Sequence, residues 1–366
     1  MGCIVPNYGM KGYPKVKPEK IIATVGTNPK WKRKVLMHKK VIVALMLLCL
    51  VGTLSLFAQG SAETKVYNLR TSTNLAPGGT VGKALTYFVE LVNKEADGRI
   101  KATANYGSEL GSQREQVEMA QTGSLEMVVA APGTGPGVWV PELMMFEFPY
   151  LFKDNNHYLR VLKGLENEVS RLVQPHGFTA AAGQSMGSRH MLTNKPINQL
   201  SDLKGLKMRG PNAVYISMFN RLGASGTTTD WNEIYNAIST GVIDGMEASP
   251  SMIYSMRFHE VAKYMAVTNH ITAAVYYFFN TDWLESLPED LRAIVLDCAD
   301  KAAAYQAEID QADQTAALDK MVAEGLVVTT PRDPEAFVKA ASPMLAEYRA
   351  KGANWAGFID KMTAID

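Results

Sequence analysis

Two stretches of this chain repeat the same order of strand and helix signals, and this repeat constrains the fold more than any other feature. In the first stretch, an extended segment at 66–72 precedes apolar residues spaced for one helix face between Val81 and Val92. An alternating segment at 100–106, a helical segment at 112–122 and a continuous apolar run at 125–131 follow. The pattern predicts a β-α-β-α-β unit.

The second unit occupies 203–246. It has a strand ending at Arg209, followed by a helix at 213–222, an extended piece at 227–229, a helix at 231–240 and a strand at 242–246. The last junctions also match, because Thr122-Gly123-Ser124-Leu125-Glu126 corresponds to Thr240-Gly241-Val242-Ile243-Asp244. We therefore expect an α/β protein with two lobes, each built on a parallel or mixed sheet flanked by helices.

A long helical pattern lies near the C-terminal end. It begins with Pro288-Glu289-Asp290 and ends at Gly325, which favours a helix over 288–324. Such a helix is too long for one small lobe, so we expect it to span both.

Residues 37–60 have the pattern of a secretory signal peptide. Met37-His38-Lys39-Lys40 is basic, 41–57 is an apolar run without charge, and Ala58-Gln59-Gly60 supplies the small residues of a cleavage site. We expect an exported, periplasmic protein whose mature chain begins near Ser61, and we interpret residues 1–36 as a mis-assigned translation start. A retained anchor or a lipid on Cys49 is the less favoured alternative, because no basic flank follows the run and Leu48 is bulky for a lipidation site.

The charge of the chain is unevenly distributed. The whole sequence has a net charge of +1, but residues 61–366 hold 27 basic and 35 acidic residues, a net charge of −8. This balance argues against a nucleic-acid partner. The three cysteines and six histidines show no metal-ligand spacing, and Gly133-Thr134-Gly135-Pro136-Gly137 lacks the helix and spacing of a dinucleotide loop, so we expect no metal and no cofactor.

Ligands of open parallel sheets bind beyond the carboxyl ends of the strands. The residues that this rule places at one cleft are Asn74, Gln113, Arg209, Trp231 and Ser249.

The sequence resembles the solute-binding proteins of TRAP transporters (tripartite ATP-independent periplasmic transporters, DctP-type) over about 65–366. The resemblance is carried by residues 187–197, GSRHMLTNKPI; 202–211, DLKGLKMRGP; 231–235, WNEIY; and 241–247, GVIDGME. It implies two lobes joined by a hinge, lobe I comprising 61–186 plus about 274–313 and lobe II 187–273 plus about 314–366. It also implies a protein that performs no catalysis, binds a small organic acid and delivers it to a membrane permease; we expect a monomer.

In that family the arginine matching Arg209 pairs with the ligand carboxylate, the one matching Arg189 supports it, and an aromatic ring often stands at the position of Trp231. The chemistry agrees, because a guanidinium offers two parallel donors that match the two oxygens of a carboxylate. A protein with net charge −8 must attract an anion locally rather than by long-range steering.

Some positions depart from the family pattern. Sialic-acid-binding members carry a glutamate near Ala131 and an asparagine near Ala248, and residues 130–137 are small and apolar here, which suggests a ligand with fewer hydroxyl groups on that side. Gly210 replaces the usual apolar residue after Arg209, so a looser strand end is expected. Dicarboxylate, sugar acid and 2-oxo acid all remain open as ligands.

The rival interpretation is an exported serine hydrolase. Gly183-Gln184-Ser185-Met186-Gly187 matches G-x-S-x-G and follows an apolar strand at 178–182. The helix that must follow a nucleophile elbow is replaced by an extended segment at 188–196, so this alternative is disfavoured.

Overall fold

The structure, a computed structural model, describes residues 65–366. The predicted signal peptide, the region before it and Cys49 lie outside these residues. The first predicted unit is confirmed, with its strands in the parallel order β2-β1-β3. Its elements are β1 (Tyr67–Ser72), α2 (Thr80–Glu95), β2 (Ile100–Asn105), α3 (Gln113–Gln121) and β3 (Met127–Ala130).

The second unit is also present, with shifted boundaries. It consists of β5 (Lys207–Arg209), α5 (Ala213–Arg221), β6 (Ser225–Thr227), a 3-10 turn η5 (Trp231–Glu233), α6 (Ile234–Ser239) and β7 (Gly245–Ala248). The strand predicted at 242–246 begins three residues later. Asp244 explains the shift, because its carboxylate accepts from the backbone N–H of Lys207 (2.8 Å) and from the Asn194 side chain (3.1 Å) before the strand starts.

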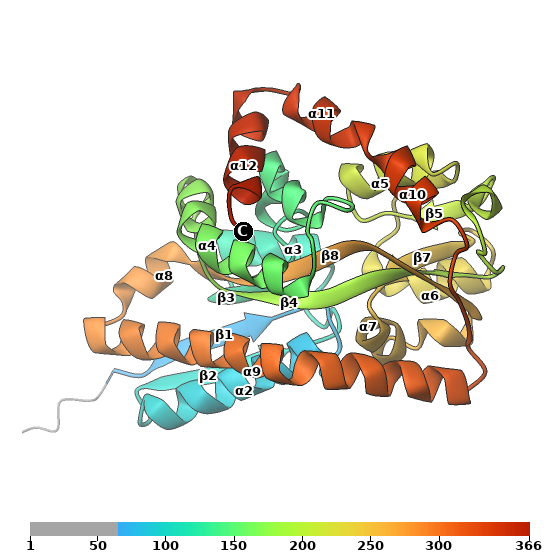
Figure 1. Cartoon of the computed structure of the whole chain (residues 1–366). Coiled ribbons are helices and arrows are strands. Elements are labelled where there is room, and N and C mark those ends of the chain that lie inside the picture. Colours follow the sequence, from blue (N-terminus) through green and yellow to red (C-terminus); the bar gives the residue numbers. More distant parts are fainter. Residues whose placement is uncertain (1–64) are drawn as a thin grey trace, which may run out of the picture. The chain divides into compact units, whose positions relative to one another are not determined.

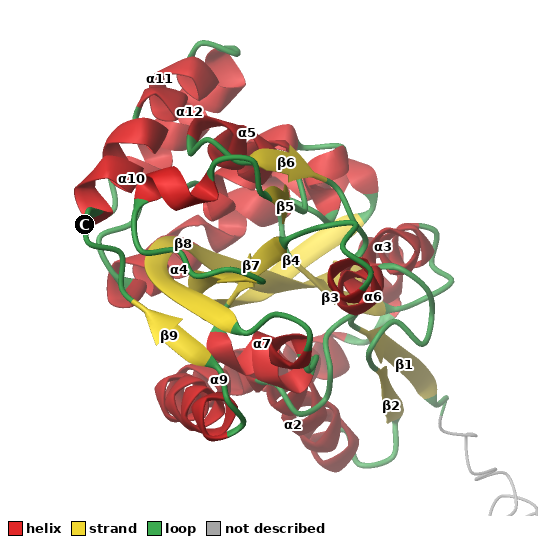
Figure 2. Cartoon of the chain, turned by 90° about the vertical axis from the view of Figure 1, so that its right-hand side faces the viewer, coloured by secondary structure: helices red, strands yellow, loops and turns green. Residues whose placement is uncertain are grey.

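Two long antiparallel strands join the lobes. They are β4 (Phe178–Thr193) and β8 (Tyr264–Asn280), and both run across the molecule between the two groups of short strands (Figure 1). The two predicted sheets are therefore parts of one mixed hydrogen-bonded sheet, in the order β2-β1-β3-β8-β4-β7-β5-β6, with β9 (Val327–Thr329) on β8. The fold is α/β with helices on both faces, and Figure 2 shows α2 and α9 together on one of them.

The register between β4 and β8 shifts three times, between Ala181 and Gln184, between Ser185 and Ser188, and between Arg189 and Met191. Bulges bend a strand and increase its twist. Ala182 and Gly187 have positive φ values of 55° and 78° at these irregularities. The bent segment is the place where β4 passes from one lobe to the other.

The predicted long helix is α9 (Glu289–Ala323), which packs against α2, β4 and α7 (Pro250–Ser255) and so spans both lobes (Figure 1). Its buried polar residues face the bent strand. Gln306 Nε2 donates to the Ser185 carbonyl at 2.6 Å, and Gln314 Oε1 accepts from the Ser251 backbone N–H at 2.9 Å.

The remaining elements surround this frame. They are η1 (Pro136–Val138), η2 (Pro141–Glu147), α4 (Asn155–Val173), η3 (Gln174–His176), η4 (Leu200–Leu203), η6 (Phe258–Glu260), α8 (Thr281–Ser286), α10 (Pro334–Ala341), α11 (Pro343–Arg349) and α12 (Ala353–Thr363). The last three lead from α5 back to α4, where Lys361 pairs with Glu168 at 2.6 Å. This contact crosses the lobe boundary expected from the sequence, and the boundaries themselves stay a prediction.

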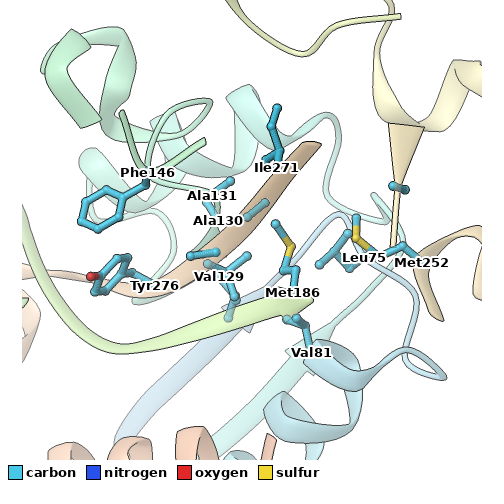
Figure 3. Packing of buried hydrophobic residues seen from close by; sticks show 14 of the residues in the cluster. Leu75, Val81, Val129, Ala130, Ala131, Phe146, Met186, Met252, Ile271 and Tyr276 are labelled. Atoms are coloured by element: carbon cyan, nitrogen blue, oxygen red, sulfur yellow. The ribbon is translucent and has the colours of Figure 1, made fainter. Parts of the chain in front are cut away.

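The core is continuous from one lobe to the other. Phe146 and Tyr276 pack edge to face with ring centroids 5.8 Å apart, and Figure 3 shows them to one side of Leu75, Met186 and Met252. Within the part of the chain that the structure describes, no helix combines the length and the apolar character needed to cross a bilayer.

Candidate functional site

A cavity of about 290 Å³ lies where the ends of β1, β3 and β5 meet the bent part of β4. One part of its wall is apolar, and Leu75, Met186 and Met252 gather there (Figure 3). The polar part is supplied by a larger set of side chains: Asn74, Ser108, Ser112, Gln113, Arg114, Thr134, Glu147, Arg189, Arg209, Tyr215, Thr228, Thr229, Asp230 and Asn232. Five of the six predicted site residues line this cavity: Arg209, Arg189, Trp231, Asn74 and Gln113.

Arg209 is the last residue of β5, and its side chain is only 6% exposed. Its Nε donates to the Thr229 carbonyl at 2.9 Å, and its guanidinium carbon lies 5.6 Å from the centre of the Trp231 ring. Among residues 65–366, no acceptor binds its two terminal nitrogens. Burial lowers the pKa of Arg209 to about 10, against the opposing effect of Glu247, so the guanidinium stays charged at neutral pH.

Gly210 holds the strand end tightly, so the looser end expected from the sequence is wrong. Its N–H donates to the Thr227 carbonyl at 2.9 Å. A Cβ built on Gly210 would lie 3.0 Å from the Tyr215 Cβ and 3.1 Å from the Ile216 nitrogen. The glycine therefore lets α5 approach β5 closely, beside Arg209.

Arg189 lies on β4 and is 3% exposed, and its partner is Glu247 on β7, which is fully buried. Both Nε and Nη2 of Arg189 donate to the Glu247 carboxylate, the second at 2.8 Å, and Nη2 also donates to the Glu247 carbonyl at 2.9 Å. Burial alone would lower the pKa of Arg189, but the Glu247 carboxylate outweighs it and the pKa is raised. Only Nη1 is left on the cavity side, where its neighbour is Met252 Sδ at 3.7 Å.

Trp231 begins η5 and is 8% exposed. Its ring meets Phe258 edge to face with centroids 5.1 Å apart, and its other neighbour is Arg209. No acceptor among the described residues binds its indole N–H. The ring is thus fixed between the apolar core and the cavity.

Asn74 and Gln113 come from the first lobe. Asn74 follows β1 and is 6% exposed. Gln113 begins α3, which is capped by Ser112 and Glu115, and its Nε2 donates to the Thr134 hydroxyl at 2.6 Å. Both side chains reach the cavity from the loops that the topology predicted.

Ser249 does not line the cavity, so this cavity does not support its assignment from the sequence, which stays a prediction. It follows β7 directly and caps α7, and its side chain is fully buried with no partner for its hydroxyl among residues 65–366. The prediction rested on the place of Ser249 after the last strand of the second unit, and in the structure this residue is enclosed at the start of α7.

The sequence analysis missed two buried acids. Glu247 ends the segment 241–247 that carries the family resemblance, but it was not predicted as a site residue. The sequence feature that could have identified it is an acidic residue inside an otherwise apolar strand. Glu147 is 2% exposed and lines the cavity, and it is the only charged residue in the apolar stretch 143–152. A lone acid in such a stretch could have drawn attention to it.

The hydrolase alternative finds no support in the structure. The Ser185 hydroxyl donates to Asn155 Oδ1 at 2.6 Å and accepts from the Gly187 N–H at 3.1 Å, so it has an amide and not a histidine as its partner. Ser185 is also 1% exposed. Among residues 65–366 no group of three or more histidine, cysteine or acidic side chains is arranged to hold a metal ion.

Comparison with known proteins agrees with the fold. The chain matches the family model "Bacterial extracellular solute-binding protein, family 7" over residues 71–351. It is 31% identical over 295 residues to a solute-binding protein of Verminephrobacter eiseniae, covering 80% of this chain and 87% of that one. It is 27% identical over 302 residues to the sialic acid-binding periplasmic protein SiaP of Vibrio cholerae, covering 81% and 92%.

The fold is also similar to a solved TRAP periplasmic solute-binding protein from Roseobacter denitrificans with bound β-D-glucuronate. The TM-score is 0.77 and the identity 27%, over 82% of this chain and 100% of that one. This chain therefore belongs to the family 7 bacterial extracellular solute-binding proteins, the binding proteins of TRAP transporters.

Proposed function

We propose that this protein is an exported, monomeric receptor that binds the carboxylate of a small organic acid through Arg209 and delivers the acid to a TRAP membrane permease. The observation that carries the proposal is the state of Arg209. Its charge is buried, and among residues 65–366 only its Nε has a protein acceptor. The carboxylates of Glu247 and Glu147 act on this charge without a hydrogen bond to it, and an anionic ligand would supply the bonded partner that its terminal nitrogens lack.

Arg189 has a supporting role in this proposal. Its pairing with Glu247 fixes the wall of the cavity and leaves Nη1 for the ligand. Trp231 supplies a flat apolar face beside Arg209, and Asn74 and Gln113 offer polar groups from the first lobe. Because these residues come from both lobes, we expect the lobes to close on the ligand as hinged bodies.

Dicarboxylates, sugar acids and 2-oxo acids share the carboxylate that Arg209 would bind. The relatives favour sugar acids, because the Roseobacter protein holds β-D-glucuronate and the Vibrio protein binds sialic acid. We therefore place sugar acids first among the candidates.

The test is a thermal-shift screen of the purified protein, residues 61–366, against organic acids that include D-glucuronate and D-gluconate. A ligand at 100 times its dissociation constant adds about 2.7 kcal/mol to the free energy of unfolding. The matched control for each acid is its methyl ester, which keeps the shape and removes the charge. Stabilisation by an acid and not by its ester supports the proposal, whereas equal shifts for acid and ester would contradict it.

A further inference from the structure

The wall of the cavity contains a carboxylate as well as guanidinium groups, and the carboxylate comes from a 3-10 turn that the sequence analysis did not include in the site. Glu147 ends η2 and lies in the wall that also contains Arg209 and Arg189. Its Oε2 accepts a hydrogen bond from Asn212 Nδ2 at 2.5 Å, while Oε1 has no donor among residues 65–366. An acceptor oxygen of a buried carboxylate thus remains available in a cavity that should bind an acid.

The small residues at 130–137 make this arrangement possible. A Cβ built on Gly133 would lie 2.7 Å from Glu147 Oε2 and 2.9 Å from the Met144 Cα, so the glycine leaves the space that the carboxylate occupies. Asn212 fixes the other side, because its Oδ1 caps α5 by accepting from the Val214 N–H at 2.9 Å. The small residues at 130–137 therefore border an acid rather than an apolar wall.

We propose that Glu147 determines which acids this cavity accepts, selecting hydroxylated monocarboxylates over dicarboxylates. The inference rests on the proposed function. With the ligand carboxylate at Arg209, the rest of the ligand extends into a cavity whose wall includes Glu147. A hydroxyl group of the ligand near Glu147 would donate a hydrogen bond to Oε1. A second carboxylate of the ligand would instead be repelled by the buried charge of Glu147, and this repulsion would lower the affinity for a dicarboxylate several-fold to many-fold.

The charged and titratable neighbours of Glu147 come from several elements. Arg189 on β4 and Arg209 on β5 favour its ionised form, while Glu247 on β7 disfavours it. Tyr158 on α4 and Tyr215 on α5 are the neighbouring phenols, and burial raises the pKa of both. Burial, the largest influence, raises the pKa of Glu147 to about 7, so rejection of a second carboxylate should strengthen from pH 6 to pH 8.

Two pairs of open-chain acids test the inference: D-gluconate with D-glucarate, and D-erythronate with meso-tartrate. Within each pair, only the terminal carbon differs, a hydroxymethyl group in one acid and a carboxylate in the other. We expect calorimetry at pH 8 to show a preference for the monocarboxylate of about tenfold or more in the wild type, corresponding to about 1.4 kcal/mol. Glu147→Gln, whose amide oxygen can still accept from Asn212, should reduce that preference at least about threefold and remove its change between pH 6 and pH 8.

Glu142→Gln is the matched control, because Glu142 is on the same 3-10 turn, is buried and does not line the cavity. It should keep the wild-type preference. Glu147→Ala provides a second variant with the same expected shift. Equal preferences in the wild type and the Glu147 variants, or a dicarboxylate preference in the wild type, would overturn this inference alone. Absence of binding by all four acids would overturn this inference, and the proposed function would fall with it only if no acid in the thermal-shift screen stabilised the protein more than its ester.

Discussion

Two arginines on neighbouring parts of the sheet have the same chemistry and almost the same burial, yet their surroundings are opposite. Arg189 on β4 is 3% exposed and is held by the Glu247 carboxylate. Arg209 on β5 is 6% exposed and has one carbonyl acceptor. Glu247 raises the pKa of Arg189, whereas burial lowers that of Arg209 to about 10. The two arginines thus differ little in burial, and the difference between them is whether a carboxylate is hydrogen-bonded to the guanidinium.

The strand β7, which carries Glu247, lies between the strands of the two arginines, but Glu247 is hydrogen-bonded to only one of them. In the antiparallel pair of β4 and β7, His190 is opposite Ala248 and Met191 is opposite Glu247, so an acid in β7 lies within reach of Arg189. Arg209 ends β5, which lies between β7 and β6; its partner on β6 is Thr227, and no hydrogen bond among residues 65–366 joins it to Glu247. Arg189 therefore has a carboxylate partner within the sheet, whereas the terminal nitrogens of Arg209 have no acceptor among residues 65–366.

The largest expected effect is on stability without ligand. Arg189→Met leaves Glu247 buried and unpaired, which should lower the free energy of unfolding by roughly 3–5 kcal/mol. Arg209→Met removes a buried charge that is hydrogen-bonded to no carboxylate, so stability should change by less than about 1 kcal/mol or increase. Urea unfolding of both variants measures this contrast, and similar losses in the two would show that the arginines are equivalent.

The second effect is the coupling between Arg189 and Glu247. Glu247→Met alone leaves Arg189 unpaired, whereas changing both residues to methionine removes both charges. The summed losses in free energy of unfolding of the two single variants should therefore exceed the loss in the double variant. We expect a coupling energy of about 0.5–3 kcal/mol from a double-mutant cycle in urea. The same cycle with Arg209 in place of Arg189 is the control and should show a clearly smaller coupling energy, because Glu247 acts on Arg209 without a hydrogen bond; equal coupling energies would remove the distinction.

A third, smaller effect concerns pH. The pKa of Glu147 is raised from 4.5 to about 7 because the carboxyl is buried, and both arginines only partly oppose this. The folded protein therefore holds a proton that the unfolded chain releases, and the stability contributed by this group at low pH is lost as pH rises through that window. The slope should be at most about 1.4 kcal/mol per pH unit. Measuring the free energy of unfolding of the wild type and of Glu147→Gln between pH 4.5 and pH 8 isolates the contribution of Glu147. If the free energies of the two proteins change in parallel with pH, the raised pKa is disproved.

The smallest effect belongs to Trp231. Trp231→Ala removes the ring beside Arg209 and should weaken ligand binding by about 1 kcal/mol, through lost contact and cation–π attraction. The dependence of affinity on salt should change little, because the charge of Arg209 remains. Calorimetry at two salt concentrations checks this, with Trp283→Ala as a control, since Trp283 stacks on Phe279 and does not line the cavity.

Local patterns were sufficient to predict the helices and strands of both units, because apolar spacing and terminal glycines are encoded within each element. They were insufficient for Glu147, whose position depends on Gly133 and Asn212, residues distant in sequence. Ser249 follows the strand as expected but is enclosed at the start of α7, and the packing of that helix is not visible in the local sequence pattern. The pairing of Arg189 with Glu247 likewise depends on the register of β4 and β7, which no single segment specifies.

The central claim is that Arg209 holds the ligand carboxylate with two parallel hydrogen bonds. Calorimetry of Arg209→Lys with an acid identified in the thermal-shift screen tests it most directly, because lysine keeps the charge and loses the paired donors. The account predicts a loss of roughly 2–5 kcal/mol, about 30-fold to several-thousand-fold in affinity, with the unfolding curve of the ligand-free variant nearly unchanged. An affinity within about threefold of the wild type would contradict it and place the carboxylate elsewhere in the cavity.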